Sequence, residues 1–174
     1  MPGALERRAS ALEVRAEGRR LEGYAAVFGA EARVGGFTET IAAGAFAESI
    51  RAGADVVALV DHDRTRLLAR TRTRTLRLAE DDHGLAFDLD MPDTQAAHDV
   101  LALAERGDLG GMSFGFTLAP GGERWRGSRR ELRAVRLHEI SVVSAWPAYD
   151  GTEVTARHRL PPRLAAARLW LESA

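Results

Sequence analysis

The sequence predicts a β-rich α+β fold, with a closed or nearly closed β-barrel flanked by helices. About nine short segments show strand-type alternation or compact apolar runs, whereas only two segments have clear helical periodicity. The regular strand–helix alternation of a doubly wound α/β fold is absent, which favours the all-strand core. A chain of 174 residues fits one domain that buries roughly 70% of its unfolded surface.

The first half of the chain is expected to hold short strands joined by glycine turns. Residues 12–17 and 20–28 form a hairpin at Gly18, and residues 34–41 form an extended segment weakened by two glycines. Residues 45–52 are expected to be a short helix that ends at Gly53. The apolar run at residues 55–60 predicts a buried strand that leads directly into Asp61-His62-Asp63.

The second half contains the clearest patterns. Strands are expected at residues 67–70, 75–78, 84–91, 113–118 and 152–157, and one or two more at 132–143. In the strand at 84–91, Phe87 and Leu89 are expected to face inward and Asp88 and Asp90 outward, and the glycine- and arginine-rich residues 121–130 are expected to be a turn. Asp93 is the expected N-cap of the best helix, which ends at Gly107. Pro161-Pro162 separates the main domain, residues 1–160, from a short amphipathic tail at residues 161–174.

Composition narrows the function. The formal net charge is -1, which does not favour binding to nucleic acid through bulk charge. Cysteine is absent, so disulfides and thiolate metal sites are excluded. The first residues lack the apolar core of a signal peptide, and no apolar run reaches membrane-spanning length, so a cytosolic protein without a membrane partner is expected.

Ser113 is the candidate nucleophile. It shares the polar face of its strand with Gly115 and Thr117, while Phe114 and Phe116 face the other way. A rigid strand below a serine and an open position beside it suit attack on a carbonyl. The preceding Gly110 and Gly111 are the candidates whose backbone N–H groups would hold an oxyanion.

The segment around Ser113 also matches G-x-S-x-G, but the nucleophile-elbow interpretation is rejected. An elbow has a strand before the serine and a helix after it. Here a strand pattern follows the serine, and the next segment contains Pro120-Gly121-Gly122, which does not continue a helix.

His62 is the candidate base, because histidine titrates near neutral pH and accepts a serine proton. A third group would orient the imidazole, and Glu139, His138, Asp61 and Asp63 are the candidates. The two aspartates are poorly placed, since neighbouring strand residues face opposite ways. Glu139 and His138 lie on a separate strand that can run beside Ser113, and they are expected on opposite faces of it.

Two other kinds of site were weighed. Asp61-His62-Asp63 contains metal-ligating residue types, but no second cluster has a matching spacing, so no metal and no other cofactor are expected. Arginine-rich segments, with Trp125 in one of them, match an RNA- or DNA-binding surface. The balanced net charge favours a solvated strand face instead.

Five segments in order resemble the HK97-type prohead proteases of tailed phages, the serine peptidases of procapsid maturation. They are GGFTETIAAGAF (35–46), LVDHD (59–63), RTRTRTLRLAEDDHGLAFDLDMPDT (70–94), RGDLGGMSFGF (106–116) and LHEISVVSAWPAYDGTEV (137–154). The resemblance implies that His62 is the catalytic histidine, Ser113 the nucleophile and Glu139 the third member. The related herpesvirus maturation proteases use a second histidine, which keeps His138 as the alternative.

The same resemblance implies a fold like that of the herpesvirus maturation proteases, with residues 1–160 as the protease domain. It implies that the substrate is the scaffolding segment of the major capsid protein precursor, cut inside the procapsid in the bacterial host cytoplasm. Self-association and self-cleavage are expected as well. The alternatives are a catalytically inactive capsid-assembly or scaffold factor and, less favoured, an arginine-rich nucleic-acid-binding β domain.

Overall fold

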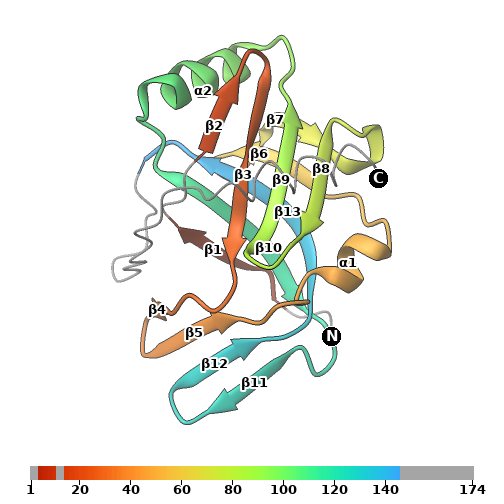
Figure 1. The fold of residues 1–174 in the computed structure, drawn as a ribbon, viewed down its shortest axis with the longest axis vertical. Coiled ribbons are helices and arrows are strands. Elements are labelled where there is room, and N and C mark those ends of the chain that lie inside the picture. Colours follow the sequence, from red (N-terminus) through yellow and green to blue (C-terminus); the bar gives the residue numbers. More distant parts are fainter. Residues whose placement is uncertain (1–3, 11–13, 146–174) are drawn as a thin grey trace.

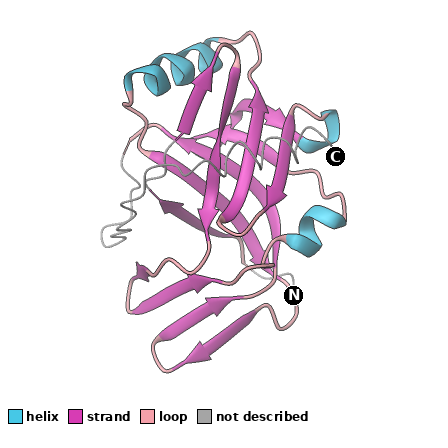
Figure 2. Cartoon of the chain, viewed as in Figure 1, coloured by secondary structure: helices cyan, strands magenta, loops and turns pink. Residues whose placement is uncertain are grey.

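A computed structural model describes residues 4–10 and 14–145, which form three β-sheets and two α-helices (Figures 1 and 2). The largest sheet has the strand order β1-β10-β13-β6-β7. Its strands are β1 (Glu6–Ser10), β10 (Gly111–Leu118), β13 (Val135–Val143), β6 (Val57–Val60) and β7 (Asp63–Arg70). Only the β13–β6 pair is parallel within this sheet.

The other two sheets have four strands each. The sheet β2-β3-β9-β8 consists of β2 (Val14–Glu17), β3 (Arg20–Val27), β9 (Gly84–Asp90) and β8 (Leu76–Glu80). It crosses the five-stranded sheet in Figure 1, whereas the third sheet lies at the lower end. The third sheet, β11-β12-β5-β4, consists of β11 (Glu123–Arg126), β12 (Arg129–Leu132), β5 (Phe37–Ile41) and β4 (Ala32–Val34).

One hydrophobic core joins the sheets and helices. Phe114 and Phe116 of β10 pack in it with Phe87 of β9 and with Ile140 of β13. The helix α2 (Gln95–Arg106) contacts β2 and buries Ala97 and Val100, and the short α1 (Ala47–Arg51) lies against β13. The apolar face of β10 therefore points into the core, which leaves the Ser113 face on the opposite side of the sheet.

The β-rich α+β class is confirmed, but the expected closed or nearly closed barrel is not. Among the described residues the strands form three separate sheets, and these sheets are not closed into a barrel. The edge strands β7 and β8 carry arginines such as Arg64, Arg66 and Arg77. Charged side chains protect an open edge against pairing, so closure is not needed to remove it.

Several element predictions needed correction. The segment at residues 34–41 belongs to a hairpin, because Gly35 adopts a φ of 54° and turns β4 into β5. The glycine- and arginine-rich segment after β10 is also a hairpin, β11–β12, rather than a plain turn. Thr94, not Asp93, caps α2, and its side chain accepts a hydrogen bond from the Ala97 N–H. The hairpin at Gly18 is confirmed.

The predicted strand at residues 152–157 and the tail at 161–174 lie outside the described residues, as does the boundary at residue 160. In the part of the chain that is described, no helix is long and apolar enough to cross a membrane.

Candidate active site

Two central strands place the candidate nucleophile and the candidate acid on one face. Ser113 of β10 lies opposite Ser141 of β13, and Gly115 lies opposite Glu139. Directly opposed residues in an antiparallel pair share a face, and residues two apart on a strand do as well. The diagonal from Ser113 to Glu139 is therefore a neighbouring position, about 7–8 Å between Cα atoms.

Both serines on this face are buried and unsatisfied. Ser113 and Ser141 each have 0% relative exposure. Their Oγ atoms have no hydrogen-bond partner among the described residues. A buried hydroxyl without a partner costs roughly 1–3 kcal/mol, so a pair of them is unusual in a purely structural position.

His62 is presented by a strained two-residue turn. Val60 pairs with Asp63, so Asp61 and His62 form the loop between β6 and β7, with φ values of 50° and 61°. Positive φ at both central residues is the type I′ arrangement that suits a hairpin, and for non-glycine residues it costs about 1–3 kcal/mol each. The Asp61 carboxylate accepts hydrogen bonds from the N–H and hydroxyl of Ser144, each at 2.8 Å, which ties the turn to the end of β13.

The imidazole of His62 contacts Glu139, so the structure brings these two predicted residues together. The distance from His62 Nδ1 to Glu139 Oε1 is 2.7 Å, and the glutamate is only 5% exposed. The same Oε1 accepts a hydrogen bond from Arg7 Nε at 2.9 Å. An arginine, a carboxylate and an imidazole thus form a continuous chain across three strands and a turn.

Gly115 provides the space that the Glu139 carboxylate occupies. A Cβ atom built on Gly115 would lie 2.6 Å from Glu139 Cγ and 2.7 Å from Oε1. These distances are shorter than real Cβ contacts, so any larger residue would displace the carboxylate from its place beside His62.

The imidazole of His138 is hydrogen-bonded to Thr117. A β-bulge between Gly115 and Phe116 leaves His138 as the extra residue of β13, and its Nε2 is 3.0 Å from Thr117 Oγ1. The expectation that His138 and Glu139 point to opposite faces is wrong, because the bulge breaks the alternation. Both line one hollow of about 530 Å³, whose walls include Leu59.

The two oxyanion candidates lie at the start of β10, with Gly110 just before the strand and Gly111 as its first residue. The Gly110 N–H donates to the Val143 carbonyl at 2.9 Å, so this group already has a hydrogen-bond partner. Gly111 adopts a φ of 141° at the start of the strand, a conformation that favours glycine. Of the two oxyanion candidates, Gly110 would have to release its bond to Val143 before it could bind a substrate.

Asp61 and Asp63, the carboxylates that suggested a metal site, are bonded to other protein groups. Asp61 bonds to Ser144 and forms an ion pair with Arg66, and Asp63 accepts hydrogen bonds from Thr65. The Thr65 hydroxyl and N–H lower the pKa of the Asp63 carboxyl below its usual value. Within residues 4–10 and 14–145, no group of three or more His, Cys, Asp or Glu side chains is arranged to hold a metal ion.

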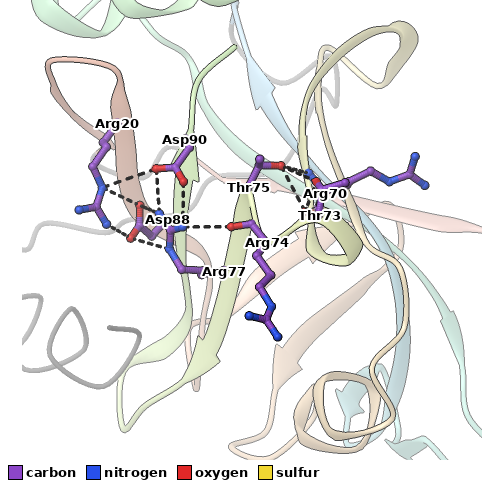
Figure 3. Close-up of polar contacts among 8 residues, drawn as sticks. All are labelled: Arg20, Arg70, Thr73, Arg74, Thr75, Arg77, Asp88 and Asp90. Carbon is purple, nitrogen blue, oxygen red and sulfur yellow. Dashed lines mark hydrogen bonds and ion pairs between the residues drawn. The ribbon is translucent and has the colours of Figure 1, made fainter. Parts of the chain in front are cut away.

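Part of the arginine-rich strand face is neutralised by ion pairs. Figure 3 shows Arg20 and Arg77 around Asp88 and Asp90 on β3, β8 and β9. Asp88 was expected to face solvent but is 1% exposed beneath these guanidinium groups. Paired arginines have less charge to offer to phosphates, which weighs against the nucleic-acid interpretation.

The second basic segment is neutralised in part. Arg130 is 6% exposed and donates hydrogen bonds to Glu6, Glu39 and Glu123, and the hydrogen bond to Glu6 is the main factor that raises the pKa of Arg130. Its guanidinium also lies 5.8 Å from the ring centroid of Trp125. The tryptophan thus stacks on an internal ion network.

Sequence reasoning missed Arg7, Ser141 and the role of Gly115. The segment around Arg7 contains no apolar alternation, so nothing in it indicates a strand beside β10. Ser141 was within an expected strand, and its position opposite Ser113 depends on the register between β10 and β13. Only a pairing of the two strands would have identified it.

Comparison with known proteins gives one match. Neither the curated proteins nor the solved structures contain a match to this chain. A protein-family model described as caudovirus prohead serine protease matches residues 5–162, nearly the whole chain. The match includes the strands that carry Ser113, Glu139 and the His62 turn, and the chain therefore belongs to the caudovirus prohead serine protease family.

Proposed function

We propose that this chain is the serine endopeptidase of procapsid maturation, with Ser113 as nucleophile, His62 as base and Glu139 as the group that orients His62. The observation that carries the proposal is the 2.7 Å contact between His62 Nδ1 and Glu139 Oε1, on the sheet face that also holds Ser113. Membership of a serine protease family supports it at the level of the reaction.

Glu139 fixes the useful tautomer of the imidazole. A carboxylate next to Nδ1 favours the tautomer in which Nδ1 carries the proton and donates a hydrogen bond to Oε1. The Nε2 atom is then left unprotonated and able to receive the proton of Ser113. When His62 becomes charged, the same carboxylate stabilises the imidazolium.

The reaction then follows the acyl-enzyme route. Ser113 Oγ attacks the scissile carbonyl while its proton passes to His62, which later returns it to the leaving amine. The N–H of Gly111, joined by that of Gly110 once it leaves Val143, would hold the oxyanion. One such donor is worth about 10²–10³ in rate. Water activated by His62 releases the acyl group.

Ser113 is fully buried, so the site must open before a peptide can reach it. The hollow beside Glu139 gives an approach on the correct face, and its lining includes the apolar Val57 and Leu67. Opening coupled to self-association or to capsid contact would restrict cleavage to the assembled shell.

The proposed substrate is the scaffolding segment of the major capsid protein precursor, and the proposed place is the interior of the procapsid in the bacterial host cytoplasm. The protease also cleaves itself in this proposal. The family supports a role with phage capsid proteins, and the substrate segment and self-cleavage are the finer steps that an experiment must decide.

The test is intact mass after co-production with the adjacent capsid-protein gene, using wild type, Ser113→Ala and the exposed-serine control Ser128→Ala. We expect a capsid chain shortened at its N-terminus with wild type and the control only, together with a shortened protease. Shortening by Ser113→Ala as well would exclude Ser113 as the nucleophile.

A second candidate is a capsid-assembly factor without catalysis. The observation in its favour is that Ser113 is buried and makes no hydrogen bond to His62 in the described structure. Full-length capsid chains in correctly assembled shells, with wild type as well as Ser113→Ala, would select this function.

A further inference from the structure

The two buried hydroxyls next to the His62–Glu139 pair have a consequence for proton transfer. Ser113 and Ser141 are register partners on β10 and β13, so their Cβ atoms are about 4.5–5.5 Å apart. At that separation one serine rotamer change brings the two Oγ atoms to hydrogen-bond distance. Both are fully buried and have no hydrogen-bond partner in the described part of the chain.

The contacts that Asp61 and His62 make with β13 lie on either side of Ser141. His62 follows β6, and the preceding Asp61 N–H donates to the Val142 carbonyl at 2.8 Å, so the turn lies beside the end of β13. The ring nevertheless reaches back to Glu139, three positions earlier on β13. Ser141 lies between these two anchor points, on the same face as Glu139.

Ser141 thus stands between the candidate nucleophile and the candidate base. The pairing of β10 with β13 places Ser141 opposite Ser113, and the contacts of Asp61 and His62 with β13 fall on Val142 and Glu139, at either side of Ser141. Ser113 itself makes no hydrogen bond to His62. A hydroxyl both donates and accepts, so it can pass a proton between two groups that do not touch.

We propose that Ser141 relays the proton from Ser113 to His62. As Ser113 Oγ forms its bond to the scissile carbonyl carbon, its proton passes to Ser141 Oγ, and the proton of Ser141 passes to Nε2 of His62. The carbonyl π electrons become the oxyanion. When the intermediate collapses, the C–N bond breaks and the proton returns along the same path to the leaving amine.

The relay rests on the proposed function, because it presumes Ser113 and His62 in their roles. It goes beyond that function by assigning a residue that neither the sequence motif nor the triad logic selects. It also explains why two neighbouring hydroxyls have no hydrogen-bond partner in the described part of the chain, since each gains its partner when the site opens.

The test measures how fast diisopropyl fluorophosphate inactivates the full-length chain in shells assembled with the capsid protein precursor, where the proposed site is open. In this reaction the attacking serine Oγ forms a bond to phosphorus, fluoride leaves, and the serine proton must go to the base. Peptide mass spectrometry identifies the labelled serine. The variants are Ser141→Ala, Ser141→Thr, His62→Ala, the double variant Ser141→Ala/His62→Ala, and the control Ser49→Ala.

Ser49 is the matched control because it is another buried serine near β13. It is 7% exposed, and its Oγ accepts a hydrogen bond from the Leu137 N–H at 2.9 Å. Its removal should lower stability without changing the labelling rate. Ser141→Ala should do the reverse, because deletion of an unsatisfied hydroxyl leaves the melting temperature unchanged or raises it.

The relay predicts that Ser141→Ala slows labelling of Ser113 about 10²-fold, in the range of a lost acid–base step. Ser141→Thr, which keeps the hydroxyl, should recover at least tenfold of this loss. The double variant should label no more slowly than His62→Ala, because the two residues act as one path. A proton inventory in mixed light and heavy water should be curved for wild type, with two protons in transit.

The outcomes separate the relay from the function on which it rests. Labelling of Ser141→Ala at the wild-type rate, with His62→Ala slow, would overturn the relay and leave direct transfer between Ser113 and His62. His62→Ala at the wild-type rate, or wild type that is not labelled, would count against the serine-protease function and the relay together. Label found on Ser141 would exchange the roles of the two serines and overturn both assignments.

Discussion

Asp88 on β9 and Glu139 on β13 are both carboxylates buried on central strands, and their surroundings differ. Asp88 is held by Arg20 and Arg77, which also share Asp90 (Figure 3). Glu139 is held by one partly exposed arginine and by an imidazole. The first carboxylate is bonded to two arginines, whereas the second is shared between an arginine and an imidazole, which both donates and accepts hydrogen bonds.

The two carboxylates also differ in whether the polar groups around them are hydrogen-bonded. The ion pairs around Asp88 join three strands of one sheet, and its buried carboxylate accepts hydrogen bonds from both arginines, as a structural network requires. The face around Glu139 instead contains two serine hydroxyls that have no hydrogen-bond partner within residues 4–10 and 14–145, and a turn with positive φ at two non-glycine residues. Backbone strain and polar groups without hydrogen-bond partners are concentrated at functional sites, where side chains must be free to transfer protons.

The largest expected effect comes from Glu139→Gln. The amide would donate from its NH₂ to Nδ1 of His62 and so favour the tautomer whose Nε2 cannot accept a proton. We expect turnover of the capsid precursor to fall about 10³–10⁴-fold, and the free energy of unfolding to change by about 1 kcal/mol or less. Turnover is measured by intact mass over time, and stability by urea unfolding.

Asp88→Asn is the matched control for that prediction. It also neutralises a buried carboxylate, but one that is paired with Arg20 and Arg77 away from the candidate site. It should therefore cost about 1–3 kcal/mol of stability and leave turnover unchanged. Wild-type turnover in Glu139→Gln would move the orienting role to His138 or to water.

The contrast between the two carboxylates also shows what the sequence can predict. The alternation around Ser113 predicted its strand and its face, and the Gly18 hairpin followed from turn chemistry. Asp88 looked like a solvent-facing residue, because alternation reports the polarity of a face and does not report which cations will cover it. Its burial depends on arginines from two other strands.

The candidate site was predictable in its residue types and not in its connections. His62 and Glu139 were selected by chemistry and resemblance, but their contact depends on a two-residue turn with positive φ. A bulge decides that His138 and Glu139 line one hollow. Arg7 comes from a strand without apolar alternation, which forms because β10 offers it an edge. Such long-range pairings leave no local pattern.

Gly115→Ala should have the next largest effect. The added Cβ would meet the Glu139 side chain at 2.6 Å and push its carboxylate away from His62. A displacement of about 1 Å costs on the order of 10²-fold in rate, so turnover should fall about 10–10²-fold. Overpacking should also lower stability by about 1–3 kcal/mol.

Gly84→Ala separates these two consequences of Gly115→Ala. Gly84 lies on β9, the strand that also carries Asp88, and its added Cβ would lie 2.0 Å from the Ala26 carbonyl oxygen. It should lower the melting temperature at least as much, while the folded fraction keeps wild-type turnover per molecule. Equal loss of turnover per folded molecule in both variants would show that Gly115 acts through stability alone.

Arg7→Gln should have a smaller effect on turnover. Arg7 donates to the Glu139 oxygen that His62 contacts, but its side chain is 37% exposed, so water and salt screen its charge. We expect turnover to fall about two- to fivefold, and the difference to shrink at 0.5 M salt relative to about 0.05 M. Arg129→Gln, which removes an exposed pair with Glu31, should change neither quantity. A salt-independent loss would mean that Arg7 acts by shape and not by charge.

The smallest effect is a change in the pH dependence of stability in Glu6→Gln. Arg130 donates to the Glu6 carboxylate, and this bond, opposed by burial, lowers the pKa of Glu6 in the folded protein below its ordinary value of 4.5. The unfolded chain then binds more protons between the two pKa values. The stabilisation by Glu6 is therefore complete above pH 4.5 and is lost as the pH falls through the folded pKa.

Glu6→Gln removes this dependence. At pH 7 the variant should be less stable than wild type by about 1 kcal/mol, since Arg130 keeps Glu39 and Glu123, and the difference should vanish at low pH. Urea midpoints between pH 3 and 7 measure it, with Glu31→Gln as the exposed control. Glu6 neighbours Arg7 on β1 but joins the ion network on the other face, so turnover at pH 7 should stay within about twofold of wild type. A larger loss of turnover would show that the network on one face of β1 sets the position of Arg7 on the other.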